Sequence, residues 1–352
     1  MHCQGKIINI EDHIHLVSIP DGLEPWEDRN EVGKLTESIF HVMPGKLEEL
    51  IENINGSDKD KITCIVADEL LGWALEVAEK MQIKRAAFWS TAAALLALGF
   101  RIPELLDDGT INNNGTPTKN QMIKLSPTMP AISTTHFVWA CIGDLATQKT
   151  FFEVIVKNNK PVAVADWLIC NSTYELEPAV FTLFPNIMPI GPLLTSNGLG
   201  NSAGYFWPKD STCLEWLDQQ PANSVIYVAF GSFTVFDQIQ FQEFALGLEL
   251  TNKPFLWVVR PDLTDDNNDA YPKGFIKEQQ LVGECWKVEL GFNCDENGIV
   301  KQGEIKNKVE QLLNDKTFKA RALDLKEVVS KSAKEGGCSH NNFNNFIEWM
   351  KA

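Results

Sequence analysis

A strand-like run that breaks at Gly231 and Ser232 raises the first chemical question. The stretch VIYVAFGSFTVFDQIQFQEFALGLE begins with β-branched and aromatic residues, and a helical pattern follows the Gly-Ser pair. At the carboxyl end of a parallel strand, a glycine lets the backbone approach a ligand, and the next helix N-terminus attracts an anion. Ser232 and Thr234 would add hydroxyl donors. The pattern fits a phosphate-binding loop but also an ordinary strand-to-helix turn, because the GxxxxGK[ST] and GxGxxG motifs are missing.

Asp68 ends a second strand-like run, ITCIVAD. Ligand sites in open α/β sheets form outside the carboxyl ends of strands, and a carboxylate there can orient a histidine, as the acid of a catalytic triad does. Asp is also a favoured helix N-cap, and the helical pattern ELLGWALEVAEKM follows directly. From these residues alone, both interpretations stay open.

Other suggestive patterns predict no site. GLGNSAG (198–204) imitates a dinucleotide fingerprint, but the non-helical YFWPKD follows it, which indicates a linker. DDNND (265–269) lacks the glycine and the final acid of an EF-hand loop. The six histidines show no metal-ligand spacing, and the eight cysteines contain no CxxC pair. We therefore expect no metal, no cofactor and reduced thiols.

The elements that must position Asp68 and Gly231 alternate between strand-like and helix-like segments. The first half gives five strand candidates: IHLVSIP, ITCIVAD, KRAAFWS, DWLICNST and NIMPIGPLL. Helical patterns separate several of them, including VGKLTESIFHVMPGKLEELIENI, GWALEVAEKM and TAAALLALGFRIPELL. After a Gly/Ser/Asn-rich linker, SVIYVAFGS, FDQIQFQEFALGLELT and PFLWVVR restart the alternation, and three helical patterns end the chain. This alternation predicts an α/β protein with parallel sheets covered on both faces.

Length and charge narrow the function classes. A chain of 352 residues favours two domains. The formal net charge of −16 makes nucleic acid and anionic membrane poor partners. The sequence contains no apolar run long enough to span a membrane, and its start lacks the apolar core of a secretory signal. We therefore expect a cytoplasmic protein.

Six segments together resemble the plant UDP-sugar-dependent glycosyltransferases. They are SIPDGLEPWEDRN, VADELLGWALEVAEKM, ICNSTYELEP, PIGPLL, SVIYVAFGSFTVFD and PFLWVVRPD, and the resemblance runs from about Ile14 to the C-terminus. It implies a GT-B fold with two Rossmann-like domains, here 1–193 and 213–335, joined by a linker (194–212) and followed by a C-terminal helix (336–352). It also implies transfer of a sugar, usually glucose, from a UDP-sugar co-substrate to a small hydroxylated acceptor, without a metal.

The resemblance assigns roles to five residues. Gly231, Ser232 and Thr234 match the loop that contacts the donor diphosphate. Asp68 matches the acid that orients a catalytic histidine, and Ser90 matches a position whose hydroxyl contacts the donor sugar. In such a mechanism the histidine removes the proton of the acceptor hydroxyl as its oxygen attacks the sugar.

Two departures from the family pattern put this reaction in question. Family members begin with a strand, a glycine-histidine loop and a helix, whereas this chain begins with MHCQGK, and no histidine can be assigned as the base. Members also carry a donor-binding signature segment, and only IKEQQLVGE (276–284) occupies its place. In a doubly wound sheet the first strand is central, so its loss is expected to expose sheet edges. Both domains are thus predicted to be incomplete.

Three interpretations follow from these residues. The first is a truncated UDP-glycosyltransferase whose activity is weak or absent. The second is a non-catalytic remnant that binds a small metabolite through apolar walls such as FVWACIGDL, or that binds a protein partner such as a full-length relative. The third is a gene-model or splicing product without a stable fold. Neither the acceptor nor the particular UDP-sugar can be named from the sequence.

Overall fold

The computed structural model describes residues 8–11, 14–29, 31–57, 61–140, 144–193, 212–231, 236–258, 288 and 290–352. The chain forms two compact units. The first consists of Met1–Thr134, Leu145–Ala203 and Lys326–Ala352, and the second of Thr135–Asp144 and Gly204–Leu325. The C-terminal residues therefore group with the first unit, while the linker and domain boundaries expected from the sequence stay predictions.

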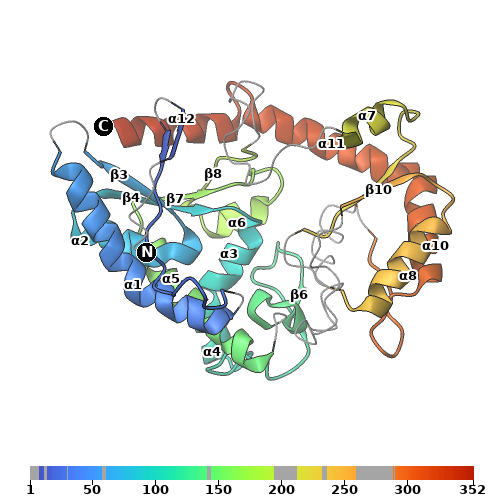
Figure 1. The fold of residues 1–352 in the computed structure, drawn as a ribbon, viewed down its shortest axis with the longest axis horizontal. Coiled ribbons are helices and arrows are strands. Elements are labelled where there is room, and N and C mark those ends of the chain that lie inside the picture. Colours follow the sequence, from blue (N-terminus) through green and yellow to red (C-terminus); the bar gives the residue numbers. More distant parts are fainter. Residues whose placement is uncertain are drawn as a thin grey trace. The chain divides into compact units, whose positions relative to one another are not determined.

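The first unit is built on a four-stranded parallel sheet (Figure 1). Its strands, in spatial order, are β3 (Cys64–Asp68), β4 (Lys84–Trp89), β7 (Trp167–Cys170) and β8 (Ile187–Pro189). Each coincides with a run that the sequence predicts as a strand. Because the strands are parallel, their carboxyl ends lie along one edge, where ligand sites of such sheets form.

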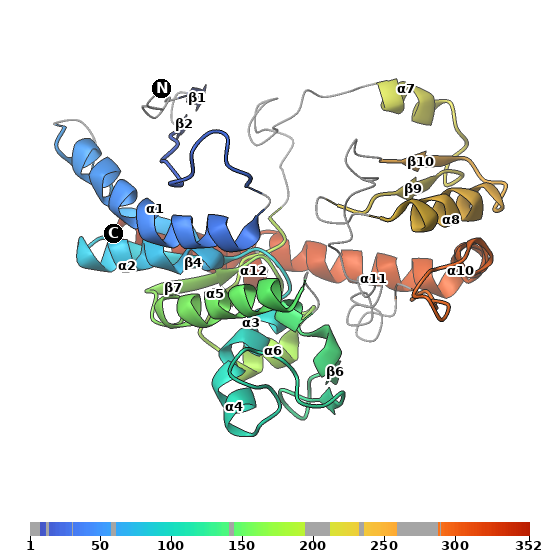
Figure 2. The same cartoon turned by 60° about the horizontal axis from the view of Figure 1, so that its bottom comes forward.

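Helices cover both faces of this sheet, as the continuous apolar strands predict. They are α1 (Val32–Asn55), α2 (Gly72–Lys80), α3 (Ala93–Phe100), α4 (Ile102–Asp107), α5 (Leu145–Ala163), α6 (Pro178–Leu183) and α12 (Cys338–Lys351). On one face, Ala87 and Leu168 pack into a core with Trp73 of α2 and Phe181 of α6. On the other face, Ala86 and Ile169 pack against Phe346 of α12. Figure 2 shows α2 and α5 together on the first of these faces.

Proline divides a segment that the sequence predicts as one helix. TAAALLALGFRIPELL forms α3 and α4, which separate at Arg101. Pro103 has no N–H with which to bond the carbonyl of Gly99, four residues earlier. The side chain of Asn159 donates to that carbonyl instead, at 2.7 Å. The helix boundary is therefore stabilised by a contact from α5.

The strand predicted in IHLVSIP forms, but it does not join the parallel sheet. It is β2 (Ile14–Leu16), which pairs antiparallel with β1 (Ile8–Glu11) in a separate hairpin. Among the described residues, β4 is the one strand paired with β3, which therefore lies at an edge of the sheet. The expected loss of a central first strand stays a prediction, because MHCQGK lies outside the described residues. A second small hairpin joins β5 (Met122–Ile123) to β6 (Ile132–Ser133).

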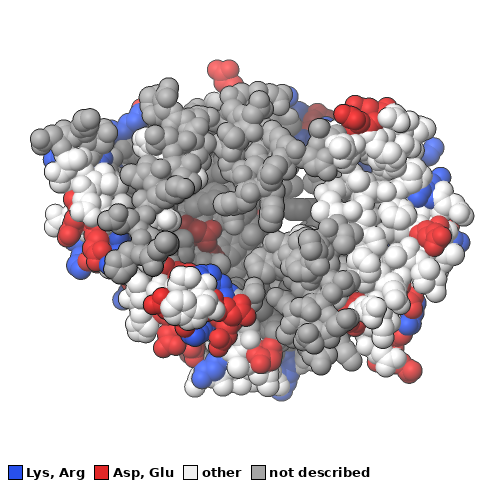
Figure 3. Space-filling view, viewed as in Figure 1, with Lys and Arg blue, Asp and Glu red and all other residues white. Residues whose placement is uncertain are grey.

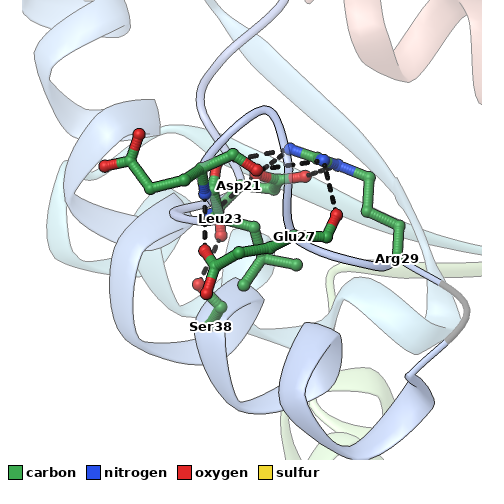
Figure 4. A network of polar contacts seen from close by, with 6 residues as sticks. Asp21, Leu23, Glu27, Arg29 and Ser38 are labelled. Carbon is green, nitrogen blue, oxygen red and sulfur yellow. Dashed lines mark hydrogen bonds and ion pairs between the residues drawn. The ribbon is translucent and has the colours of Figure 1, made fainter.

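The loop after β2 is fixed by an ion-pair network (Figure 4). Arg29 donates from Nε to Oδ2 of Asp21 at 2.8 Å and from Nη2 to Oδ1 at 3.2 Å. The hydroxyl of Ser38, on α1, donates to the backbone carbonyl of Asp21 at 2.8 Å. Beside it, Gly22 adopts a φ of +90° against Ser38 and Val42, a conformation and a space that suit only glycine. These contacts hold the segment DGLEPWEDR against the start of α1.

The second unit contains a smaller sheet in its described part, with β9 (Ile226–Val228) parallel to β10 (Phe255–Trp257). Its helices are α7 (Thr212–Asp218), α8 (Gln238–Glu249) and α10 (Gln302–Asn314), and α11 (Lys316–Ala333) continues into the first unit. Phe236, Phe244, Val300 and Ile305 form its core. The predicted helices are confirmed. CWKVELGF (285–292), which the sequence offers as at most one further strand, forms no strand in its described residues, 288 and 290–292.

Positive and negative side chains are mixed on the described surface (Figure 3). On the face seen in Figure 3, the described Lys and Arg side chains lie among Asp and Glu rather than in a broad basic patch. Within the described residues, no helix is both long and apolar enough to cross a membrane.

Candidate functional site

The carboxyl edge of the first sheet brings two of the predicted site residues together. Asp68 is the last residue of β3, and Ser90 directly follows β4, its parallel neighbour. Asp68 is half-buried and Ser90 is exposed. Adjacent parallel strands place both side chains where a ligand can approach an open α/β sheet.

Asp68 has a structural role in this edge. Its Oδ1 accepts a hydrogen bond from the backbone N–H of Leu70 at 3.1 Å, which caps the short 3₁₀ helix Glu69–Leu71. The capping interpretation is therefore confirmed for this 3₁₀ helix, whereas α2 itself begins after Leu71 and has no side-chain cap. Among the described residues, no histidine contacts this carboxylate. The role of Asp68 as an orienting acid stays a prediction.

Glu69 forms a carboxyl pair with Asp68. Burial, followed by the hydrogen bond and the negative charge of Asp68, raises the pKa of Glu69 to about 9. At neutral pH Glu69 is therefore a neutral acid that can donate a hydrogen bond to Asp68. We did not expect a role for Glu69 from the sequence, although two successive acids after a buried strand are a visible signal.

The loop that carries Ser90 is held by contacts from other elements. The indole Nε1 of Trp89 donates to the carbonyl of Ala92 at 2.8 Å. Glu177 accepts hydrogen bonds from the first two N–H groups of α3, those of Ala93 and Ala94, at 2.9 and 2.8 Å. The Ser172 hydroxyl donates to the same carboxylate at 2.5 Å. The N-terminus of α3 is thus occupied by the chain's own carboxylate.

Glu177 is a second residue that the sequence reasoning missed. It lies in STYELEP, a segment that contributes to the family resemblance, but it contacts residues more than eighty positions away in the chain. No local pattern links Glu177 to α3. Its carboxylate satisfies helix N–H groups that otherwise lack partners, and it thereby fixes the backbone next to Ser90.

The loop after β9 has the backbone expected of a tight turn. Gly231 adopts a φ of +72°, and a Cβ at this position would meet nothing within 4 Å. A larger side chain would therefore have room here, and glycine is favoured by the backbone conformation alone. Ser232 and Thr234 lie outside the described residues, so their contact with a diphosphate stays a prediction.

The helix after this loop is capped by its own residue. Oδ1 of Asp237 accepts a hydrogen bond from the N–H of Gln240, at the start of α8, at 2.7 Å. A carboxylate at this position neutralises part of the positive end of the helix dipole. The helix N-terminus is consequently a weaker anion site than the strand-turn-helix pattern suggests.

Several predicted features fall outside the described residues. These are MHCQGK with His2, the glycine-rich stretch 198–204, the acidic loop 265–269 and the segment 276–284. The described part of the chain contains no cluster of three or more His, Cys, Asp or Glu side chains that could hold a metal ion.

Comparison with known proteins decides the family. No protein-family model matches the chain. UDP-glycosyltransferase 83A1 of Arabidopsis thaliana is 40% identical to it over 395 aligned residues, which cover 97% of this chain and 85% of the relative. The chain belongs to the UDP-glycosyltransferase family. This identity confirms the family that the quoted segments suggest.

Solved structures of plant UDP-glycosyltransferases show the same fold. A UDP-glucosyltransferase from Polygonum tinctorium, in complex with 3,4-dichloroaniline, has a TM-score of 0.72 at 19% identity, over 93% of this chain and 84% of that one. Phytolacca americana UGT2, with UDP-2fluoro-glucose and pterostilbene, has a TM-score of 0.69 at 20% identity, over 91% and 82%. The α/β fold of GT-B type is therefore confirmed.

Proposed function

We propose that this UDP-glycosyltransferase transfers a sugar, glucose, from a UDP-sugar to a hydroxyl of a small acceptor, and that it does so slowly. The observation that carries the proposal is the 40% identity to UDP-glycosyltransferase 83A1 over nearly the whole chain. The Phytolacca americana structure contains a UDP-sugar analogue together with a small phenolic molecule, which supports this pair of ligand classes.

The candidate residues take the roles that the family pattern implies. Ser90 is exposed, on a loop held by the hydrogen bond from Trp89 to Ala92, and it contacts the donor sugar. Gly231, Ser232 and Thr234 contact the diphosphate. Asp68 orients the group that removes the proton of the acceptor hydroxyl, as that oxygen attacks the anomeric carbon and UDP leaves. The co-substrate supplies the leaving group, so this reaction needs no resident cofactor.

The proposed slowness rests on missing donor contacts. The alignment with the Arabidopsis relative spans 395 positions, which is more than the 352 residues of this chain. The relative therefore has residues at positions where this chain has none, and the family pattern places one such gap at 276–284. Fewer contacts with the donor in the transition state reduce the rate.

Thermal unfolding with UDP-glucose and a measurement of acceptor-dependent UDP release together test the proposal. A donor at a hundred times its dissociation constant stabilises the native state by about 2.7 kcal/mol, so the transition should move upward. UDP release with hydroxylated acceptors should be slow in the natural chain and lower still in Asp68→Asn, with the exposed Asp324→Asn as matched control. Release that is absent, or equal in both variants, would overturn the proposal.

A second candidate is a non-catalytic protein that binds a metabolite or a protein partner. The carboxylates at the N-termini of α3 and α8, from Glu177 and Asp237, favour it, because each occupies a place where a donor phosphate could bind. Calorimetric binding of an acceptor, without any response to UDP-glucose, would select this candidate.

We also propose that the protein is cytoplasmic and that it can pair with a full-length relative. The support for pairing is the edge of β3, which has no partner strand among the described residues and which a strand of a relative could pair with. Microscopy of a tagged chain tests the location. Co-purification from cells that express both proteins tests the pairing, and recovery of the chain alone would contradict it.

A further inference from the structure

The open edge of β3 is the most conspicuous unpartnered feature of the first unit. In the described structure β3 has β4 on one side and no strand on the other. Such an edge presents a row of unpaired N–H and C=O groups. The side chain of Val66, in the middle of the strand, is 47% exposed, whereas its neighbour in the sheet, Ala86, is fully buried. The sheet therefore ends on an apolar, accessible strand.

The exposure of Val66 has a clear structural origin. Val66 is in register with Ala86, which packs against α12. The core that α12 covers includes residues of β4, β7 and β8 but none of β3. One face of β3 next to the open edge is consequently uncovered, while its opposite face, with Ala67, packs into the main core.

The edge also carries opposite charges at its two ends. Lys61 lies three residues before the strand and is exposed, Asp68 ends the strand, and Glu69 begins the 3₁₀ helix that follows. Two copies that pair antiparallel bring the basic end of each to the acidic end of the other. A parallel arrangement would instead bring like charges together, which is unfavourable. The strand is thus electrostatically complementary to itself in one orientation.

The register of the pairing is set by which face of the sheet each side chain occupies and by the charges at the two ends of the strand. A two-fold axis perpendicular to the sheet keeps each side chain on its own face, so opposed residues must be an even number of positions apart. The register centred on Ile65 sets Lys61 near Glu69 of the second copy. It also sets Cys64 directly opposite Val66, on the uncovered face.

We propose that two copies of this chain associate through antiparallel pairing of their β3 edges. The contact is isologous, because each copy supplies the same segment. It continues the four-stranded sheet of one copy into that of the other and pairs the backbone groups of both edges. Each exposed Val66 is covered by the partner strand.

The proposed pairing places a positive charge next to the carboxyl groups of Asp68 and Glu69. Burial and the neighbouring Asp68 raise the pKa of Glu69 to about 9. An ammonium group of Lys61 from the second copy lies close to this carboxyl pair and offsets the charge of Asp68, while the larger cause, burial, remains. Each dimer contains two such ends, so a charge change at Lys61 acts twice.

Sedimentation velocity over a range of concentrations tests the association. We expect a monomer-dimer equilibrium in the natural chain. Lys61→Glu should raise the dissociation constant about tenfold, since at each of the two ends a carboxylate replaces an ammonium group beside Asp68, with an effect of up to about 1 kcal/mol each. The control Lys253→Glu makes the same charge change at an exposed site in the second unit and should leave the constant unchanged.

Disulfide trapping tests the register. Val66→Cys places a thiol opposite Cys64 of the second copy, so mild oxidation should give a covalent dimer in which fragmentation of the linked peptides joins Cys64 of one copy to the new cysteine of the other. Leu70→Cys, also exposed but beyond the strand, is the matched control and should link no more than the natural chain. A monomer at every concentration, equal effects of the two charge variants, or equal trapping by the two cysteine variants would overturn the proposal. None of these readouts depends on sugar transfer.

Discussion

Replacement of Glu69 by Gln should stabilise the protein above mildly acidic pH. In the folded state the pKa of Glu69 is raised from 4.5 to about 9 by burial first and by Asp68 second. Between these two values the native state holds a proton that the unfolded chain releases. Unfolding therefore becomes easier as the pH rises through this window, and the native state is most favoured below about 4.5. Gln cannot ionise, and its amide can still donate to Asp68.

The size of the effect follows from the pKa difference. Each pKa unit corresponds to about 1.4 kcal/mol, so the unscreened limit over the whole window is about 6 kcal/mol. Because Glu69 is only half-buried, solvent screening reduces this, and we expect the variant to gain about 1–2 kcal/mol between pH 5 and pH 8.

Urea unfolding at several pH values measures this gain. Glu76→Gln, at an exposed carboxylate of α2 close in the sequence, is the matched control. The stability difference between Glu69→Gln and the natural chain should widen as pH rises, while the control should follow the natural chain. If both variants show the same pH dependence, Glu69 is ionised in the folded state and the carboxyl pair is wrongly described.

Three further substitutions test the contacts that fix the site. Asp21→Asn breaks the partly exposed ion pair with Arg29, which lowers the pKa of Asp21. In urea unfolding we expect the variant to lose about 0.5–1 kcal/mol of unfolding free energy at pH 7. This loss should vanish as the pH falls through the lowered pKa of Asp21 in the folded state. Glu177→Gln removes the charged cap of α3 and should cost about 1 kcal/mol and speed hydrogen exchange at its first amides, whereas the exposed Glu175→Gln should do neither. Asn159→Ala leaves the Gly99 carbonyl unpaired and should cost about 1–3 kcal/mol in thermal or urea unfolding. No loss in this last variant would mean that another group satisfies the carbonyl.

Much of the fold could be predicted because its signals are local. Continuous apolar runs before Asp68 and Trp89 indicate buried strands, and the parallel order of β3 and β4 then brings Asp68 and Ser90 to one edge. Helical periodicity likewise locates α8 and α12. The functional roles of these positions came from the family resemblance, because hydrophobic periodicity indicates secondary structure and not function.

The remaining features depend on contacts between distant residues. Phe346 packs beside Trp167, with ring centroids 5.6 Å apart, and no local pattern indicates that the last helix returns to the first sheet. The raised pKa of Glu69 requires burial by other elements. The hairpin of β2 with β1 shows a different limit, since its pattern predicts a strand but does not specify the strand with which it pairs.

Detection of the glycoside itself tests the central claim most directly. The chain would be incubated with UDP-glucose labelled in the sugar and with a panel of small hydroxylated acceptors, and the products separated by mass. We predict slow accumulation of a labelled glycoside, attached through an acceptor oxygen, that Asp68→Asn strongly reduces and Asp324→Asn does not. A folded chain that forms no labelled glycoside with any acceptor, and whose unfolding temperature does not respond to UDP-glucose, would contradict the claim.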